Sequence, residues 1–383
     1  MNKADDAGDS SGLFQVRVRR AVPDLEWDAF VEATAGGTYH QSSIWAQVKA
    51  VMGWDSARLV LRREGKIVGG CQLLLRTVPL AGVVAYVPRG PVVADRDARA
   101  LSTVLTAVQS LVAQERIVYL KLQPPPDRHD MTAELAARGF VESSLEAAPR
   151  ATVRVDLQRS PQALLSAMRQ NARRNIAKAR RLGVVVREGG PQDLAEFGRL
   201  IDATSHRQGF APYPQRYYEQ MWDLFTARDR ARLLVAEHDG VVLASNLVVG
   251  FAEDAVFKIG GWCGTRKNVP PNELLHWAGM QWGRERGYRY YDFDNIGLSV
   301  AQALLAGEQP HPDVYHGVAR FKLGFGGEVM LFPRSYDYTC RPLLAGALRR
   351  LAPKLDRFRP LADRALGRGS ASTSGARRQS GEV

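Results

Sequence analysis

The sequence predicts an α/β (α+β) protein made of two similar units in tandem. Two observations lead to this fold class. The composition, with 45% hydrophobic and 24% charged residues, is that of a folded globular chain. One order of predicted strands and helices also occurs twice along the 383 residues, a length that suits two domains better than one. We therefore expect two α/β domains, each with its own hydrophobic core.

The predicted repeat starts with two β-hairpins, at residues 57–76 and 231–250. In each, two apolar runs are joined by a short turn, and the second turn contains one extra residue. Each hairpin is followed by a predicted helix, over 97–116 and 272–287 respectively, then by a strand and a segment that ends in Gly-Phe. Chance similarity between ordinary strands is the alternative, and the shared order of elements argues against it.

Basic residues outnumber acidic ones by twelve, which indicates a polyanionic partner such as nucleic acid, a nucleotide-linked substrate or an anionic membrane surface. From Arg341 onward there are ten Lys or Arg and only three Asp or Glu. Residues 341–366 have Leu at helical spacing with Arg between, which predicts C-terminal basic helices that form either an exposed basic surface or a membrane-surface contact. Residues 1–12 and 367–383 are rich in small residues and are predicted to be disordered.

Other residue types exclude several classes of protein. Three widely separated cysteines give neither a CxxC metal pair nor a disulfide framework, and no apolar run approaches the ~18 residues of a membrane span. A cytoplasmic location is therefore expected. No G-x-S-x-G motif marks a nucleophile. No metal site is predicted either, because the histidines are scattered singles, among them His40, His206, His276 and His316.

A basic segment, MRQNARRNIAKARRLGVVVR (168–187), contains seven Lys or Arg and no acidic residue. Ser160 as N-cap, Pro161 at the first helical position and Gly183 after the last turn predict one continuous helix. Its apolar stripe consists of Leu165, Met168, Ala172, Ile176 and Ala179. The arginines that fall largely off this stripe are Arg169, Arg173, Arg174, Arg180 and Arg181. They form either an ordinary solvated face or a face that contacts phosphate groups.

Six motifs occur in the order found in one known family: HQSSIWAQVKAVMGW, AYVPRGPVV, MRQNARRNIAKARRLGV, SHRQGFAPYPQRYY, PPNELLHWAGMQWGRERGYRYYDFDNIG and RFKLGFGGEV. From about Leu13 to about Leu344, the chain resembles the Fem-type (FemABX) aminoacyltransferases that build peptidoglycan interpeptide bridges. The resemblance implies two tandem GNAT-like domains, at 13–150 and 151–340. The long coiled-coil arm that some members insert in the second domain is missing, since no extended heptad segment is present.

The resemblance also implies an activity. An amino acid would move from aminoacyl-tRNA, the co-substrate, to the stem-peptide amine of a UDP-linked or lipid-linked peptidoglycan precursor, and no cofactor is expected. Such a transfer requires that the protein hold both reactants and stabilise an oxyanion, without a covalent enzyme intermediate. Two other functions stay open. One is an N-acyltransferase that uses acyl-CoA or another acyl carrier on a sugar, lipid or peptide amine, and the other is a non-enzymatic RNA-binding protein.

The resemblance assigns contacts with the precursor's diphosphate to Lys49 and Arg207. Taken alone, Lys49 lies off the apolar stripe of its predicted helix and is expected to be exposed. Arg207 is followed by Gly209 and two prolines, which predicts a loop. Tyr213, in the same segment, is a candidate for hydrogen bonding to the sugar or peptide, or for packing on the surface. The tRNA phosphates are assigned to Arg173, Arg174 and Arg181 of the basic segment.

The Phe-Lys pair before Gly-Phe-Gly matches that of the family, so Phe321 and Lys322 are the catalytic candidates. Lys322 would stabilise the carbonyl oxyanion or the tRNA terminus, and Phe321 would stack on the terminal adenine. A tight glycine turn without a ligand is the alternative. The acetyl-CoA signature of ordinary GNAT enzymes is not met, since Phe321 stands three residues before Gly324. Asp292 and Asp294, at a strand end, fit either a general base or a cap of the next turn.

Overall fold

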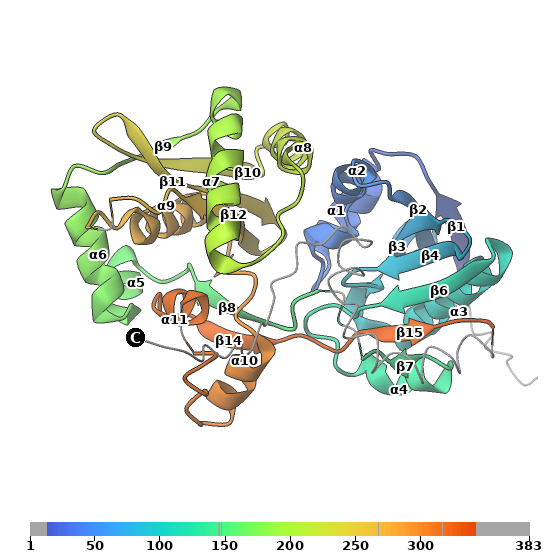
Figure 1. Cartoon of the computed structure of the whole chain (residues 1–383). Helices are drawn as coiled ribbons and strands as arrows, with labels where there is room; N and C mark the ends of the chain where they lie inside the picture. Colours follow the sequence, from blue (N-terminus) through green and yellow to red (C-terminus); the bar gives the residue numbers. More distant parts are fainter. Residues whose placement is uncertain (1–13, 145, 147, 267, 316, 342–383) are drawn as a thin grey trace, which may run out of the picture. The chain divides into compact units, whose positions relative to one another are not determined.

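The computed structural model describes residues 14–144, 146, 148–266, 268–315 and 317–341 (Figure 1). They form two compact units: unit 1 contains the chain up to Arg150 and again from Phe332, and unit 2 contains Ala151–Leu331. The predicted disordered segments 1–12 and 367–383 lie outside the described residues, as do all but the first residue of the predicted helices at 341–366.

Unit 1 is a mixed sheet with helices packed on it. Its strands are ordered β1-β2-β3-β4-β6-β15-β7, with β5 paired to β3, and its main apolar core lies between the sheet and α3. In chain order the elements are β1 (Gln15–Arg19), α1 (Leu25–Ala33), η1 (Tyr39–Gln41), α2 (Ser43–Ala50), β2 (Asp55–Arg63), β3 (Lys66–Val78), β4 (Gly82–Val87), β5 (Val92–Val93), η2 (Ala94–Arg96), α3 (Ala98–Gln114), β6 (Ile117–Leu122), α4 (Met131–Ala137), β7 (Val141–Glu142) and β15 (Tyr336–Tyr338).

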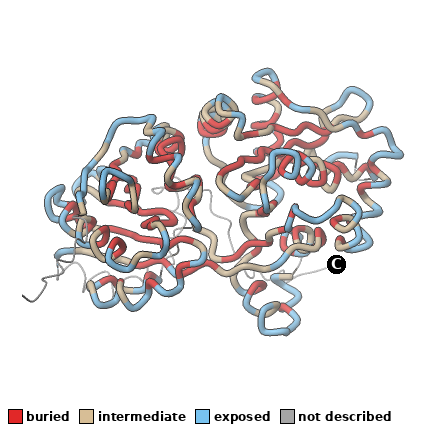
Figure 2. The backbone as a smooth tube through the Cα atoms, turned by 180° about the vertical axis from the view of Figure 1, so that it is seen from behind, coloured by how far each residue is buried: buried red, intermediate tan, exposed pale blue. Residues whose placement is uncertain are grey.

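Unit 2 has a second mixed sheet, ordered β14-β8-β13-β12-β11-β10-β9. Helices α9 and α6 pack on one face and α7 on the other, so the central strands are buried on both sides, as the red segments of Figure 2 show. The elements are β8 (Ala151–Asp156), α5 (Pro161–Ala167), α6 (Gln170–Arg181), β9 (Val185–Glu188), η3 (Pro191–Asp193), α7 (Leu194–Gln208), α8 (Gln215–Thr226), β10 (Ala231–His238), β11 (Val241–Phe251), β12 (Asp254–Trp262), α9 (Pro271–Glu285), β13 (Tyr290–Asp292), α10 (Leu298–Leu305), α11 (Val318–Leu323) and β14 (Glu328–Leu331).

The two units repeat one topology. The order β1-α1-α2-β2-β3-β4-α3-β6 in unit 1 matches β9-α7-α8-β10-β11-β12-α9-β13 in unit 2. In both sheets neighbouring strands of the repeat are antiparallel except the last pair, β4·β6 and β12·β13, which is parallel and is connected through the helix that covers the sheet. The predicted α/β (α+β) class and its internal duplication are confirmed.

The hairpin turns differ from the prediction in length. Both are two-residue turns, Glu64-Gly65 and Asp239-Gly240, in which all four residues have positive φ. This is the turn whose twist matches that of the strands. The extra residue predicted for the second turn was therefore wrong, because His238 and Val241 pair with each other and belong to the strands.

The chain passes from unit 1 to unit 2 just before β8 and returns to unit 1 before β15. β8 follows β7 in the chain but pairs with β13 and β14 of unit 2, and β15 follows β14 but pairs with β6 and β7 of unit 1. The sequence prediction places residues 332–340 in the second domain, whereas the chain from Phe332 belongs to unit 1 and β15 (Tyr336–Tyr338) pairs within the first sheet. Contacts with unit 1 hold this segment. Asp337 Oδ1 accepts hydrogen bonds from Lys121 Nζ (2.7 Å) and Tyr119 Oη (2.6 Å), and Tyr336 is buried in the unit 1 core.

Residues 160–183 form two helices, α5 and α6, rather than the single helix predicted. Ser160 caps α5 and Gly183, with φ +82°, ends α6, as expected, but Met168 and Arg169 are extended between them. The Arg169 N–H donates to the carbonyl of Gly324 (2.8 Å), and the Arg173 guanidinium donates to the carbonyls of Ser166 (3.1 Å) and Met168. A contact with the glycine loop, residues 324–327, thus breaks the helix. Arg173 donates hydrogen bonds to the carbonyl groups that the break exposes.

The glycine loop approaches α5 too closely for a side chain. Gly326 has φ +76°, and a Cβ added there would lie 2.4 Å from the carbonyl oxygen of Ala167. Gly287 has nearly the same φ, +79°, with nothing within 4 Å of its Cβ position. Alanine substitution at the two positions therefore separates the free-energy cost of a positive φ from the free-energy cost of the clash.

Gly326→Ala should destabilise unit 2 far more than Gly287→Ala. An alanine forced to positive φ costs about 1 kcal/mol, and the backbone clash at Gly326 should add roughly 2 kcal/mol or more. Urea unfolding of the two variants and the parent protein measures the difference. Equal losses would contradict the close approach of the glycine loop to α5.

Candidate functional site

The candidate site lies in unit 2, where β12 and β13 stop pairing. The two strands pair only over Asp254–Val256 and Tyr290–Asp292, after which β12 continues to Trp262 while the chain from Phe293 leaves the sheet. Residues at the ends of diverging parallel strands are a common place for ligands in open α/β sheets. Helix α11, which carries Lys322, packs beside this point.

Lys322 is held at this point by backbone carbonyls. Its side chain is buried (7% exposed), and Nζ donates to the carbonyl oxygens of Phe293 (2.5 Å) and Asn295 (2.8 Å). Burial lowers the pKa of Lys322 to about 8, against the opposing effect of Asp294 and Asp292. An ammonium has three N–H donors, so within the part of the chain that the structure describes one donor is left for a ligand.

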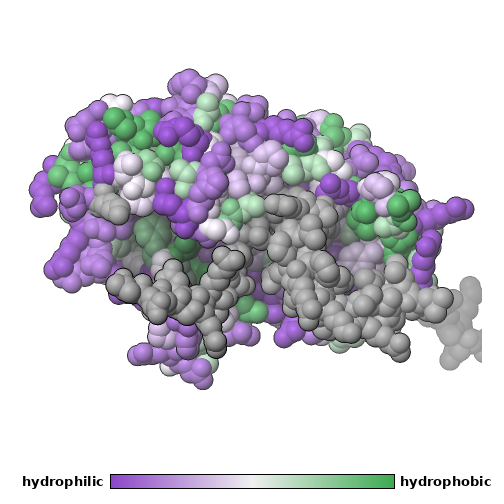
Figure 3. All heavy atoms as spheres, in the orientation of Figure 1, coloured by the Kyte–Doolittle hydropathy of each residue, from purple (hydrophilic) through white to green (hydrophobic). Residues whose placement is uncertain are grey.

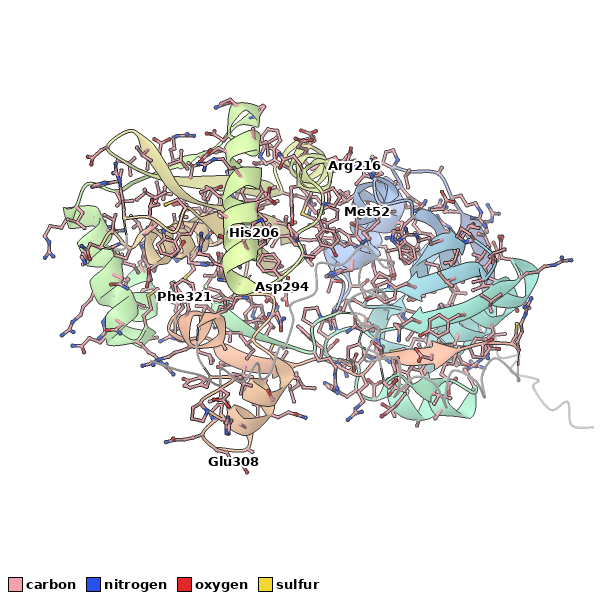
Figure 4. All side chains as sticks on the ribbon, viewed as in Figure 1. Met52, His206, Arg216, Asp294, Glu308 and Phe321 are labelled. Atoms are coloured by element: carbon pink, nitrogen blue, oxygen red, sulfur yellow. The ribbon has the colours of Figure 1, made fainter. Side chains whose placement is uncertain are left out.

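Charged side chains surround Lys322. Asp292 is buried, and its pKa is raised by desolvation and by the nearby Asp254. Its carboxylate accepts hydrogen bonds from the Thr152 hydroxyl and from the N–H of Asp294 (2.7 Å), and Arg154 Nε lies 3.9 Å away. The turn-capping alternative for this aspartate is thus confirmed. Asp294, labelled in Figure 4, lies 3.6 Å from Lys258 Nζ.

Phe321 belongs to a group of tilted and edge-to-face rings around His276. The His276 ring lies 5.4 Å from Phe321, 5.3 Å from Phe325 and 4.5 Å from Phe257, measured between centroids. Its Nδ1 is 3.0 Å from the Tyr291 hydroxyl, and burial, helped by Lys322, lowers the pKa of His276 to about 3. His276 is therefore a neutral core residue that packs against Phe321. Phe321 is labelled in Figure 4.

Arg207 lies in the last turn of α7 and not in the predicted loop. The loop begins after Arg207, because Gly209, with φ +71°, caps the helix directly after Gln208. The exposed Arg207 guanidinium donates to the Trp262 carbonyl and to Thr204 Oγ1 (3.0 Å) and lies 5.1 Å from the Trp262 ring. It is therefore anchored at the end of β12.

Tyr213 packs on its neighbours in the connection before α8. Its ring stacks on Tyr217 at 4.1 Å, and its N–H donates to the Tyr218 hydroxyl (3.0 Å). The surface-packing alternative accounts for the ring, which is half-buried. Its hydroxyl as a substrate contact remains a prediction.

Lys49 is buried, contrary to its expected exposure. It lies in the last turn of α2 in unit 1, is 6% exposed, and its Nζ lies 5.8 Å from the Trp45 ring. The helical stripe is wider than the sequence indicated, because Ala46 and Ser43 are buried along with Trp45 and Val48. The contact of Lys49 with the precursor's diphosphate remains a prediction.

The arginines of α6 differ in their surroundings. Arg173 is engaged by the carbonyls at the α5–α6 break, whereas Arg174 and Arg181 are exposed and make no side-chain hydrogen bond or ion pair with any described residue. Figure 3 shows hydrophilic atoms over α6, at the left of the view. Ala172, Ile176 and Ala179 form the buried stripe as predicted.

Sequence reasoning missed three charged residues of the site: Arg154, Asp254 and Lys258. A charged residue inside an otherwise apolar strand is the signal that each offered, since Arg154 lies in β8 and the other two in β12. Across the described residues there is no group of three His, Cys, Asp or Glu side chains that could hold a metal ion. Among the described helices, none combines the length and hydrophobicity of a membrane span.

The comparisons with known proteins agree with this architecture. Residues 22–138 match the FemAB family, and residues 166–302 match an acetyltransferase (GNAT) domain. A lipid II:glycine glycyltransferase of Staphylococcus saprophyticus is 23% identical over 87% of this chain and 96% of its own length. A protein of the same description from Staphylococcus aureus strain MRSA252 is 27% identical, over 57% of this chain and only 54% of its own length.

Solved structures share the fold. The crystal structure of FemX matches 87% of this chain and 99% of its own with a TM-score of 0.77 at 20% identity. A tandem GNAT protein from the clavulanic acid biosynthesis pathway matches 86% of this chain and 99% of its own with a TM-score of 0.52 at 15% identity. With a FemAB match in unit 1, a GNAT match in unit 2 and a duplicated topology, the chain is similar along both units to the Fem-type family of tandem GNAT proteins.

Proposed function

We propose that this protein is an aminoacyltransferase of peptidoglycan bridge formation, which moves an amino acid from aminoacyl-tRNA to the stem-peptide amine of a lipid-linked or UDP-linked precursor. The observation that carries the proposal is the buried Lys322 ammonium, held by two carbonyls at the divergence of β12 and β13 with one N–H to spare. Relatives described as lipid II:glycine glycyltransferases support a lipid-linked acceptor.

The reaction needs positioning and charge stabilisation more than a nucleophile. The acceptor amine, once deprotonated, attacks the ester carbonyl, a C–N bond forms, the C–O bond to the tRNA breaks, and the ribose hydroxyl leaves with a proton. Negative charge develops on the carbonyl oxygen before that bond breaks. The third N–H of Lys322 donates to this oxyanion, and its geometry is fixed in advance by Phe293 and Asn295.

The other candidate residues have separate tasks in this proposal. Lys49 and Arg207 contact the diphosphate of the precursor, and Tyr213 contacts its sugar or peptide. Arg173, Arg174 and Arg181 contact tRNA phosphates, and Phe321 stacks on the terminal adenine. A cytoplasmic location, peripheral contact with an anionic membrane surface and the absence of a cofactor complete the proposal.

An N-acyltransferase that uses acyl-CoA is the second candidate. The GNAT domain match over residues 166–302 favours it, since acyl-CoA is a donor that this fold accepts elsewhere. Phe321 in place of the Gln or Arg of the acetyl-CoA signature argues against it. The acyl donor that the protein uses, charged tRNA or acyl-CoA, therefore distinguishes the two functions.

A donor competition tests the proposed function. A mixture of charged tRNAs and a mixture of acyl-CoAs are each offered with UDP-linked pentapeptide and with lipid-linked precursor, and mass spectrometry identifies the product. The proposal predicts an aminoacylated stem peptide from charged tRNA and no product from acyl-CoA. An acyl-CoA product with no transfer from tRNA would establish the second candidate instead.

The arginines of α6 give a matched test of tRNA contact. Arg174→Gln with Arg181→Gln should raise the Michaelis constant for charged tRNA several-fold and reduce the salt slope by roughly 1 to 2, because each exposed phosphate contact releases counterions. Arg173→Gln should in addition lower the unfolding midpoint, because the Arg173 Nη1 also donates to the carbonyls of Ser166 and Met168. An unchanged slope in the double variant would mean that α6 has an ordinary solvated face.

A further inference from the structure

A carboxamide with no partner lies in the interior of unit 2. Asn246, in the middle of β11, is 3% exposed, and its Nδ2 has no hydrogen-bond partner among the described residues. A buried amide group without a partner destabilises the folded protein, and an apolar residue of similar size would not. A ligand that supplies an acceptor would satisfy this donor.

Strand pairing fixes the face on which Asn246 lies. It is paired with Leu234 of β10, and Ala244 and Val248 flank it two residues away on β11. These three residues belong to the core cluster beneath α9. Because paired and alternate residues share a face, Asn246 lies on the α9 face of the sheet, the face that also carries Phe257.

Gly260 makes room for the carboxamide. It is paired with Asn246 across β11 and β12, and a Cβ added at Gly260 would lie 2.0 Å from Asn246 Oδ1 and 3.0 Å from Phe257 Cε2. The Asn246 side chain thus extends over Gly260 toward Phe257. The Phe257 ring centroid is in turn 5.6 Å from Lys322 Nζ. Asn246 Oδ1 and the Lys322 ammonium therefore both lie near the Phe257 ring.

We propose that Asn246 is a specificity-determining residue that donates a hydrogen bond from Nδ2 to the aminoacyl group carried by the tRNA. This inference rests on the proposed aminoacyltransferase function. An aminoacyl ester offers a carbonyl oxygen as acceptor, and a site built to hydrogen-bond a group discriminates strongly against a ligand that lacks it. Asn246 would thereby distinguish charged from uncharged tRNA.

Asn246→Leu tests the inference, because leucine keeps the approximate size and removes the amide. The unfolding midpoint should be unchanged or higher, since no buried donor is left unpaired. Meanwhile kcat/KM for charged tRNA should fall at least ~10-fold, and the preference for charged over uncharged tRNA in equilibrium binding should be lost. Asn246→Ala provides the same readouts if the leucine variant does not fold.

Ser245→Ala is the matched control. Ser245 is adjacent in β11, 1% exposed, and its hydroxyl also has no partner among the described residues. It lies on the opposite face, because its pairing partner Gly261 is backed by Leu200 of α7. Its removal should change neither kcat/KM nor the preference for charged tRNA.

The outcomes separate the inference from the function on which it rests. If the parent protein transfers amino acids and Asn246→Leu retains its kcat/KM and its preference for charged tRNA, the inference is overturned and the proposed function stands. If the parent protein transfers from no charged tRNA, the proposed function fails and the inference fails with it. Loss of both readouts in Asn246→Leu alone supports the inference.

Discussion

The site depends on one buried ammonium held by two backbone carbonyls. Lys322 Nζ joins α11 to the chain that leaves β13, and it does so in an environment that lowers its pKa to about 8. Removing a lysine from water is costly, so the charge is retained only because the two carbonyls and the nearby aspartates compensate it. A donor fixed in this way needs no reorganisation when an oxyanion forms. The same contacts position Phe321 against His276.

The fold supplies the rigidity that this arrangement needs. β13, which precedes the carbonyls of Phe293 and Asn295, is paired on one side with β12 and on the other with β8, a strand that arrives directly from unit 1 in the chain. The glycine loop after Lys322 is held by the connection between α5 and α6, because the Arg169 N–H donates a hydrogen bond to the Gly324 carbonyl. Two separate segments of the chain therefore hold the C-terminal end of α11.

Local signals in the sequence predicted local structure well. Ser160 and Gly183 marked helix ends, and the duplicated order of hairpin, helix and strand gave the fold class, because capping and turn chemistry act within a few residues. Features set by distant contacts were missed. The break at Met168–Arg169 depends on Gly324, the burial of Lys49 depends on how α2 packs, and the unpaired amide of Asn246 becomes visible only when Gly260 lies opposite it. The family resemblance pointed to Lys322 and Phe321, whereas the only sequence signal for Arg154, Asp254 and Lys258 was a charged residue within a largely apolar strand.

Single-turnover transfer by Lys322→Met tests the central claim most directly. Methionine keeps the length of the side chain and removes the donor, so the rate of transfer from charged tRNA should fall by roughly 100-fold or more, as when an oxyanion-hole donor is lost. Affinity for the precursor, measured by equilibrium binding, should stay within about 2-fold, since Lys322 acts on the transition state in this account. A folded Lys322→Met protein that transfers at the parent rate would contradict the account.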